Sequence, residues 1–377
     1  MTTLITNGTV VSASGAVDMD VLVDGEQIAA LLQPGATGLG TDLASSAERV
    51  IDARGKYVVP GGVDAHTHME LPFGGTAASD TFETGTRAAA WGGTTTIIDF
   101  AVQRAGERVF DGLEAWHRKA DGNCAIDYAF HMIIGGVDDD SLTAMDRLVS
   151  QEGISSVKLF MAYPGVFLSE DGQILRAMQK AAENGSMIMM HAENGTAIDV
   201  LIAQSLARGN VDPLYHGLTR PVALEEEATH RAIKLAEVAG CPLYIVHMSA
   251  REAVERVMEA RDRGGNVFGE TCPQYLYLSL EDHLGAPGFE GAKYVCSTPL
   301  RSKHEHHQAD LWRFLRTNDL QVVSTDHCPF CFKEQKELGV GDFSKIPNGI
   351  GGVEHRMDLL YQGVVDGEIS LERWVEV

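Results

Sequence analysis

The stretch SSVKLFMAYP, residues 155–164, has the composition of a buried β-strand with a lysine in its middle. The apolar residues on both sides of Lys158 suit a strand that is covered on both faces, as the strands of parallel sheets are. An unpaired ammonium ion is costly in such a place, and burial lowers the pKa of a lysine amine. Lys158 therefore either extends its amine to the end of the strand or has a chemical purpose there.

Apolar runs of similar length occur on both sides of this stretch. From Tyr57 onward they alternate with helical stretches, which is the pattern of parallel βα units. The eight runs are, in chain order, YVVPGGVDAHTH, TTTIIDFAV, AIDYAFHMII, SSVKLFMAY, SMIMMHAEN, PLYIVHMS, NVFGETCP and LQVVSTDH. Eight parallel strands close a (β/α)8 barrel. The sequence thus predicts an α/β fold in which residues 56–377 form a TIM-like (β/α)8 barrel.

Residues 1–55 have a different pattern. Short β-prone pieces are separated there by the turn signals Asn7-Gly8 and Asp24-Gly25. Such pairs between apolar pieces are strong signals for tight turns. We therefore expect a small N-terminal β-domain over residues 1–55.

Composition excludes several classes of partner. The chain has 377 residues, a formal net charge of −23 and a pI near 4.9, so its field repels nucleic-acid phosphates and anionic membranes. The N-terminus MTTLITNGTVV lacks the regions of a signal peptide, and no apolar run approaches the ~20 residues of a membrane span. We expect a cytoplasmic protein. Its six cysteines form no disulfide framework, and the pair Cys328 and Cys331 has no second pair to complete a zinc site.

Residues that can bind metal ions fall at the ends of these runs. They are His66 and His68 in the first run, Lys158 in the fourth, His191 in the fifth, His247 in the sixth and Asp326 in the eighth. The carboxyl ends of the strands of a closed parallel barrel meet at one mouth, where enzymes of this architecture keep their active sites. One histidine at a strand end is more often structural than a ligand, but the joint pattern favours a metal site.

The histidine spacing suits two metal ions. His66 and His68 lie on the same side of a strand, because side chains alternate along it, and can bind one ion. His191 and His247 supply a second pair from neighbouring strands. Four histidines and one aspartate are few ligands for two divalent ions, so a bridging anion is needed.

Lys158 can become that anion. A neutral amine adds carbon dioxide to form a carbamate (N6-carboxylysine), whose two oxygens can bridge two cations that offset its charge. The alternative is that Lys158 extends to the barrel mouth and pairs with Asp326.

Other polar residues near these runs have simpler explanations. The histidines of KHEHH, residues 303–307, are expected to begin a solvated helix, since no apolar strand delivers them to the mouth. His327 points to the opposite strand face from Asp326. Asp64 shares a face with His66 and is expected to support the ligands rather than to join them.

Seven segments resemble the signature segments of the dihydropyrimidinase and hydantoinase family, within the amidohydrolase superfamily. They are, in chain order, GGVDAHTHMELPF, SVKLFMAYPG, HAENG, VHMS, STPLR, STDHCPF and IPNGIGGVE. The resemblance extends from the N-terminus to the last residue. One departure is Thr298, where the family leads us to expect a proline before Pro299. The change is expected to loosen the loop that carries Ser297.

The resemblance implies two divalent metal ions, usually zinc with manganese or cobalt as alternatives, which share a hydroxide and a carboxylated Lys158. The residues that match the metal-binding positions are His66, His68 and Asp326 for one ion and His191 and His247 for the other. The residues that match the substrate-binding positions are Tyr163, Ser297 and Asn348.

The implied activity is the hydrolytic ring opening of dihydropyrimidines such as dihydrouracil, or of 5-substituted hydantoins, to N-carbamoyl amino acids. In that mechanism a hydroxide between the metals attacks the carbonyl, Asp326 carries a proton to the departing ring nitrogen, and Tyr163 donates to the developing oxyanion. Allantoinase and dihydroorotase are the alternative enzymes. Dihydroorotases place an arginine two residues after the second histidine, where this chain has Glu70, which is expected to repel a carboxylate substrate.

The family also includes non-catalytic scaffold relatives, but these lack the metal ligands, and all six ligand positions are present here. Family members are commonly homotetramers, so we expect that assembly and a small-molecule cyclic amide as substrate. The family's polypeptide normally continues past LERWVEV, residues 371–377, to strands that pair with the N-terminal β-domain. We therefore expect a half β-sandwich without its C-terminal strands, with unpaired edges in residues 1–54.

Overall fold

The strands of the larger sheet follow one another in chain order. In the computed structural model, which describes residues 1–34 and 47–377, they are β6 (Gly62–Thr67), β9 (Thr94–Gln103), β10 (Asp127–Ile134), β11 (Ser156–Phe160), β12 (Met187–His191), β13 (Leu243–Ile245), β14 (Val267–Thr271) and β15 (Val322–Val323). Neighbours from β9 to β15 pair in parallel. Each strand falls on one of the predicted runs, and the predicted TIM-like barrel is confirmed.

The barrel closes where its last strand meets its first. A parallel bridge joins Thr67 to His327, and the amide of His68 donates to the carbonyl of His327 at 2.8 Å. This seam is short, because β15 itself has only two residues. It lies next to His66, His68 and Asp326 in the sequence.

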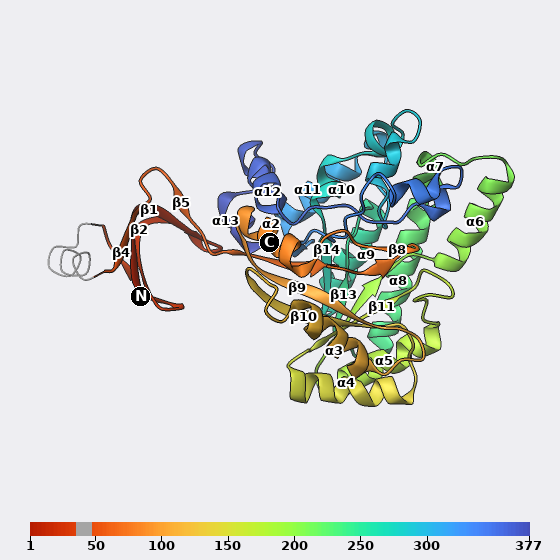
Figure 1. Ribbon diagram of the computed structural model, residues 1–377, viewed down its shortest axis with the longest axis horizontal. Coiled ribbons are helices and arrows are strands. Elements are labelled where there is room, and N and C mark those ends of the chain that lie inside the picture. The colour runs from red at the N-terminus through yellow and green to blue at the C-terminus, as the bar shows by residue number, and fades with distance from the viewer. Residues whose placement is uncertain (35–46) are drawn as a thin grey trace. The chain divides into compact units, whose positions relative to one another are not determined.

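Helices surround the strands of this unit (Figure 1). They are α2 (Phe82–Trp91), α3 (Val109–Ala120), α4 (Asp139–Glu152), α5 (Asp171–Asn184), α6 (Gly195–Ala207), α7 (Leu214–Leu218), α8 (Val222–Ala239), α9 (Arg251–Asp262), α10 (Pro273–Tyr277) and α11 (His307–Thr317), followed by α12 (Arg356–Val365). The ends of α4 show the local cause: a capping box pairs Asp138 with Ser141, and Gly153 ends the helix at a φ of 70°.

Short elements lie between the strands and helices of this unit in the chain. A hairpin of β7 (Pro72–Phe73) and β8 (Thr76–Ala77) follows β6. Single helical turns are η1 (Leu280–Leu284), η2 (Glu290–Tyr294), η3 (Lys303–Glu305), η4 (Lys336–Gly339) and η5 (Phe343–Lys345).

The KHEHH segment corrects one expectation. α11 begins at His307, whose side chain is buried and whose Nδ1 accepts a hydrogen bond from the Arg251 amide at 3.1 Å. The predicted solvated helix start is therefore wrong for His307, because this end of α11 packs against α9.

A smaller unit contains the N-terminal strands. It comprises Met1–Gly62 and Leu360–Val377 by its own contacts, while Val63–Leu359 form the barrel unit. Its strands are β1 (Thr2–Ser12), β2 (Gly15–Asp24), β3 (Gln27–Leu32), β4 (Arg49–Asp52) and β5 (Tyr57–Val58), in the order β3-β2-β1-β4 with β5 also paired to β1. The last helix, α13 (Leu371–Glu376), packs on β1. The predicted division between residues 55 and 56 stays a prediction.

The two turn signals of this unit behave differently. Gly25, at a φ of 59°, forms the predicted turn between β2 and β3. At Asn7-Gly8, by contrast, β1 continues and its register with β2 shifts, so this pair forms a bulge and the predicted turn is wrong. Apolar side chains remain exposed on this sheet, with Ile28 at 69% and Leu31 at 53%.

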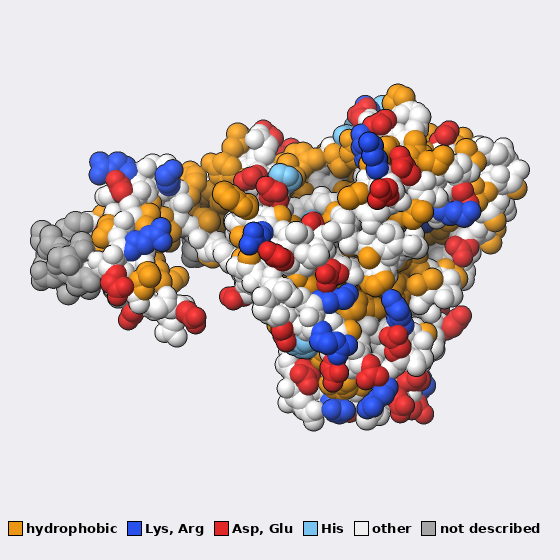
Figure 2. Space-filling view, viewed as in Figure 1, with side chains coloured by type: hydrophobic (Ala, Val, Ile, Leu, Met, Phe, Trp, Pro, Cys, Tyr) orange, Lys and Arg blue, Asp and Glu red, His pale blue; other side chains and the backbone are white. Residues whose placement is uncertain are grey.

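Acidic and basic side chains are interspersed on the face of the barrel unit that Figure 2 shows. On that face neither sign of charge gathers into one large patch. In residues 1–34 and 47–377, no helix combines the length and the apolar character needed to cross a membrane.

Candidate metal centre and active site

A histidine pair and an aspartate meet at the seam of the barrel. His66 lies near the end of β6, His68 follows that strand, and Asp326 follows β15. The Nε2 atoms of the two histidines lie 3.2 Å apart, and Asp326 Oδ1 lies 3.2 Å from the first and 3.3 Å from the second. All three side chains are largely buried. Their ligand atoms converge on one point, as the sequence predicted for one half of a metal centre.

Lys158 reaches the same point from the middle of β11. Its Nζ lies 2.8 Å from His66 Nε2 and sits 4.3 Å from the ring centre of Phe100. The side chain is 1% exposed, and burial lowers the pKa of Lys158, against the opposing charge of Asp326. The chemistry expected of this residue needs a neutral amine, and burial shifts the amine toward that form.

The second histidine pair lies beside the first. His191 ends β12 and His247 follows β13; their ring centres are 4.6 Å apart, and His247 lies 5.5 Å from the ring of His66. Burial holds the pKa values of His66, His68 and His247 well below the usual range. These imidazoles are therefore neutral, which is the form that binds metal ions.

Two glutamates that the sequence analysis did not single out orient these histidines. Glu270, in β14, lies with Oε1 2.7 Å from His66 Nδ1 and accepts from the His247 amide at 3.0 Å. Glu193 Oε2 lies 2.8 Å from His191 Nε2. A signal for Glu270 was present, since it is a carboxylate inside the apolar run NVFGETCP, just as Lys158 is a cation inside another.

Asp64 supports the backbone at the seam. Its Oδ1 accepts hydrogen bonds from the amides of His66 at 3.2 Å and of Thr325 at 3.1 Å, and its Oδ2 accepts from the Thr325 hydroxyl at 2.6 Å. It contacts the backbone of the ligand strands rather than the ligand atoms. His327 turns away, and its Nε2 lies 2.9 Å from Asp80.

Three site residues have a left-handed backbone. Tyr163 has a φ of 62°, His247 of 41° and Asp326 of 51°. Residues other than glycine adopt this region at a cost and are found there chiefly where the surroundings hold them in place, often at functional sites. Each of these residues lies just beyond the end of its strand, where the chain turns and the side chain is directed toward the mouth.

A cavity opens onto these residues. Its polar lining away from the histidines is Tyr163, Ser297 and Asn348, and its apolar lining is Leu71, Phe73, Ile133, Phe160 and Phe167. Glu70 is not among the lining residues. The expected repulsion of a carboxylate substrate by Glu70 therefore has no support in the geometry.

The three polar lining residues form one hydrogen-bonding group. Asn348 Nδ2 donates to Ser297 Oγ at 3.0 Å. Burial and the charge of Glu193 raise the pKa of Tyr163 well above its usual value, against hydrogen bonds with Ser297 and Asn348. Tyr163 is therefore a hydroxyl donor at every physiological pH.

The loop that carries Ser297 is held in place by hydrogen bonds at Thr298. Thr298 is buried, its Oγ1 donates to the His247 carbonyl at 2.8 Å, and its own carbonyl accepts from the Tyr275 hydroxyl at 2.9 Å. The expectation that Thr298 loosens this loop is wrong, because the threonine hydroxyl adds a hydrogen bond that proline cannot make.

Comparison with known proteins identifies the family. Residues 57–377 match the amidohydrolase family. The chain belongs to the amidohydrolase family. It is 66% identical to the D-hydantoinase of Streptomyces coelicolor over 375 residues, which covers all of this chain and 79% of that relative.

Solved structures of other amidohydrolases of this kind share its fold. The dihydropyrimidinase of Brevibacillus agri superposes with a TM-score of 0.95 at 48% identity, and the L-hydantoinase of Arthrobacter aurescens with 0.85 at 31%. Each match covers all of this chain and 80% of the other. The predicted membership of the dihydropyrimidinase and hydantoinase family is confirmed, and the chain is a cyclic amidohydrolase.

Amidohydrolases typically bind a binuclear metal centre, and the donors of this amidohydrolase fit such a centre. His66, His68 and Asp326 bring three ligand atoms within 4.8 Å of one another. Among the described residues, the buried Nδ1 of His247 has no hydrogen-bond partner. Neutral imidazoles and a carboxylate are the donors that zinc and similar divalent ions prefer.

Proposed function

We propose that this protein hydrolyses 5,6-dihydropyrimidines such as dihydrouracil, and 5-substituted hydantoins, to N-carbamoyl amino acids. The observation that carries the proposal is the composition of the cavity. A cluster of metal-binding side chains forms one wall, and the neutral hydrogen-bonding group of Tyr163, Ser297 and Asn348 forms another. A cyclic amide needs both, because its ring edge must be held while one carbonyl is attacked.

Two divalent ions, with zinc as the first candidate and manganese or cobalt as alternatives, complete the proposed site. The residues that would hold them are His66, His68 and Asp326 for one ion, His191 and His247 for the other, and carboxylated Lys158 for both. When bound, such ions activate water and polarise the carbonyl under attack. The 2.8 Å separation of Lys158 Nζ and His66 Nε2 supports a shared role for this lysine.

Asp326 is the proposed proton carrier. Its carboxylate lies at the mouth within 3.3 Å of both histidine nitrogens, where it can accept a proton from the attacking water. The water oxygen adds to the carbonyl carbon, the ring C–N bond breaks, and Asp326 returns the proton to the departing nitrogen.

Tyr163 is the proposed donor to the carbonyl oxygen. It keeps its proton because burial raises its pKa, so it can donate to the oxygen as negative charge develops there. Ser297 and Asn348 would hold the remaining edge of the ring, since their hydroxyl and amide groups both donate and accept hydrogen bonds.

The lining also bears on substrate choice. Among the described residues no arginine lines the cavity at the metal-binding cluster, while Arg220 lines the adjoining hollow that shares Tyr163 and Asn348. A ring carboxylate held at the cluster would therefore find no bidentate partner there. Loss of even ~1.4 kcal/mol of such pairing changes kcat/KM about tenfold. We therefore expect dihydroorotate to be a poor substrate.

A substrate panel tests the proposal. Metal-loaded protein should hydrolyse dihydrouracil or a 5-substituted hydantoin at least about tenfold better, in kcat/KM, than dihydroorotate or allantoin. Asp326→Asn, measured in parallel, should lose at least about a hundredfold in kcat and so exclude a contaminating enzyme. A preference for dihydroorotate or allantoin would contradict the assignment.

Tetrameric assembly and a cytoplasmic location stay predictions of the sequence. We propose a homotetramer, which light scattering of the purified protein would test.

A further inference from the structure

Lys336 is a buried lysine outside the cavity. It begins η4, and its side chain is 1% exposed. Its Nζ donates hydrogen bonds to the carbonyls of Val295 at 2.9 Å, Pro347 at 2.7 Å and Gly349 at 2.8 Å. An ammonium group has three N–H donors, and each has one acceptor here.

The three carbonyls belong to the two segments that carry the polar lining. Val295 lies two residues before Ser297, while Pro347 and Gly349 flank Asn348 on both sides. The segments also pair directly, since the Gly349 amide donates to the Val295 carbonyl at 2.9 Å. One lysine side chain thus joins two chain segments that are about 50 residues apart, at the place where the side chains of Ser297 and Asn348 meet.

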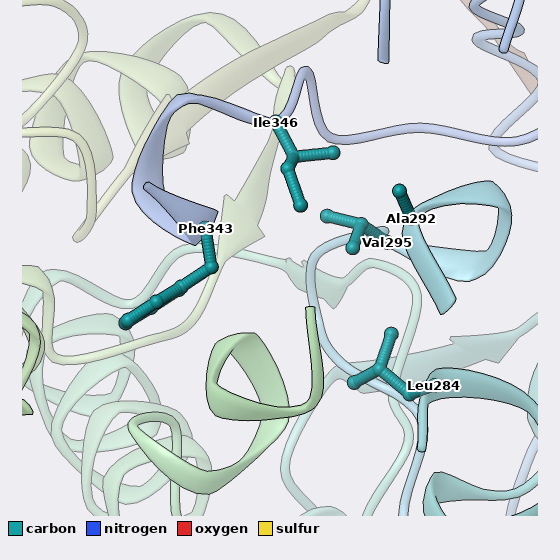
Figure 3. Packing of buried hydrophobic residues seen from close by; sticks show 5 residues of the cluster. All are labelled: Leu284, Ala292, Val295, Phe343 and Ile346. Atoms are coloured by element: carbon teal, nitrogen blue, oxygen red, sulfur yellow. The ribbon is translucent and has the colours of Figure 1, made fainter. Parts of the chain in front are cut away.

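An apolar cluster also anchors the same segments. Figure 3 shows the side chains of Val295 and Ile346 close to Phe343, Ala292 and Leu284, all of them buried. Packing of this kind fixes where a segment lies but leaves its carbonyl groups to be satisfied by other partners. Lys336 satisfies three of them.

We propose that Lys336 is a positioning residue for substrate binding, which sets the relative placement of Ser297 and Asn348 by holding the backbone of both segments. The proposal rests on the proposed function of these two residues. Lys336 does not line the cavity, so its effect on substrate passes through the residues it holds.

Lys336→Met tests this role. Methionine retains much of the apolar stem but has no N–H donor. The carbonyls of Pro347 and Gly349 therefore lose this partner, and that of Val295 keeps only the Gly349 amide. We expect KM for hydantoin or dihydrouracil to rise about tenfold or more, while kcat falls less than about threefold, because ground-state and transition-state binding weaken together. Metal content should stay at the wild-type level, since Lys336 contacts none of the proposed ligands.

Two further variants make the result decisive. Lys333→Met, in the same loop but with an exposed side chain, should leave KM unchanged. Lys336→Arg keeps several N–H donors and is the variant to use if Lys336→Met does not fold. Its longer, forked side chain should displace the segments and raise KM at least about threefold.

The outcomes separate the two proposals. A wild-type protein that is metal-loaded but inactive on the whole panel would contradict the proposed function. An active wild type together with a folded Lys336→Met or Lys336→Arg of unchanged KM would overturn the positioning role. A loss of metal in either variant, with KM restored by reloading, would assign Lys336 to the metal centre instead and would also overturn it.

Discussion

Replacing Glu270 with glutamine should weaken metal binding at the His66, His68 and Asp326 cluster by roughly five- to thirtyfold. Glu270 is buried in β14 and accepts hydrogen bonds on both oxygens, from His66 Nδ1 and the His247 amide on one and from the Tyr244 hydroxyl at 2.8 Å on the other. With Nδ1 committed as a donor, His66 presents the lone pair of Nε2 to the cluster.

The size of the effect follows from these contacts. Glutamine has nearly the same shape and keeps one acceptor oxygen, so what it removes is the negative charge. A hydrogen bond to a charged group contributes ~1.5–3 kcal/mol against ~0.5–1.5 kcal/mol for a neutral one, a difference of about 1–2 kcal/mol. At 1.4 kcal/mol per decade this is roughly a five- to thirtyfold loss of affinity.

Competition with a chelator of known affinity would measure the metal dissociation constant of Glu270→Gln and of the wild type. Tyr244→Phe is the matched control, because it removes one partner of Glu270 and leaves the charge beside His66. It should change the affinity less than about threefold. If Glu270→Gln bound metal as tightly as the wild type, the carboxylate would have no part in holding His66, and this reasoning would be refuted.

Three other variants test the site and its surroundings. Lys158→Ala should lose both metal ions and activity together, and two metals per chain with near wild-type turnover in the absence of added carboxylic acid would disprove the bridging role. Tyr163→Phe should lower kcat about 10²- to 10³-fold with metal content unchanged, as expected for one oxyanion donor; steady-state kinetics with metal analysis would show it, and a change in KM alone would contradict the role. His216 is buried, accepts from Arg220 at 3.0 Å and lies 2.8 Å from the Cys296 carbonyl, and burial holds its pKa well below 6.5. Below pH ~6.5 the unfolded chain takes up a proton here that the folded chain does not. The free energy of unfolding therefore decreases as the pH is lowered, by up to ~1.4 kcal/mol per pH unit. His216→Gln should remove that share of the slope in denaturant unfolding between pH 6 and 5, and equal slopes would count against it.

The barrel could be predicted from the sequence because its strands are buried on both faces. Such strands are continuous apolar runs, so both their number and their order are visible without any knowledge of their partners. The pair Asn7-Gly8 shows the limit. The same two residues suit a tight turn and a bulge, and the choice depends on whether β2 pairs across them, which is a tertiary contact.

The candidate metal-binding residues could be singled out for a related reason. A polar residue at the end of an apolar run is easy to recognise in a sequence. The barrel topology then places the carboxyl ends of all the strands at one mouth. Lys336 offers no comparable signal. It lies in an irregular segment of mixed composition, FKEQKELG, and only the folded chain shows that its neighbours are carbonyls rather than water. Ser297 and Asn348 likewise became candidates through the family resemblance and not through their own surroundings in the sequence.

The seam between β15 and β6 has a consequence for the order in which the protein matures. His66 and Asp326 are separated by some 260 residues, yet an ion held between them would tie the first barrel strand to the last. No partly synthesised chain that ends before Asp326 can offer that set of ligands. Metal binding at this position would therefore be a late event, which stabilises a barrel that has already formed from the other strands. Removal of the metal by a chelator would weaken this junction before any other.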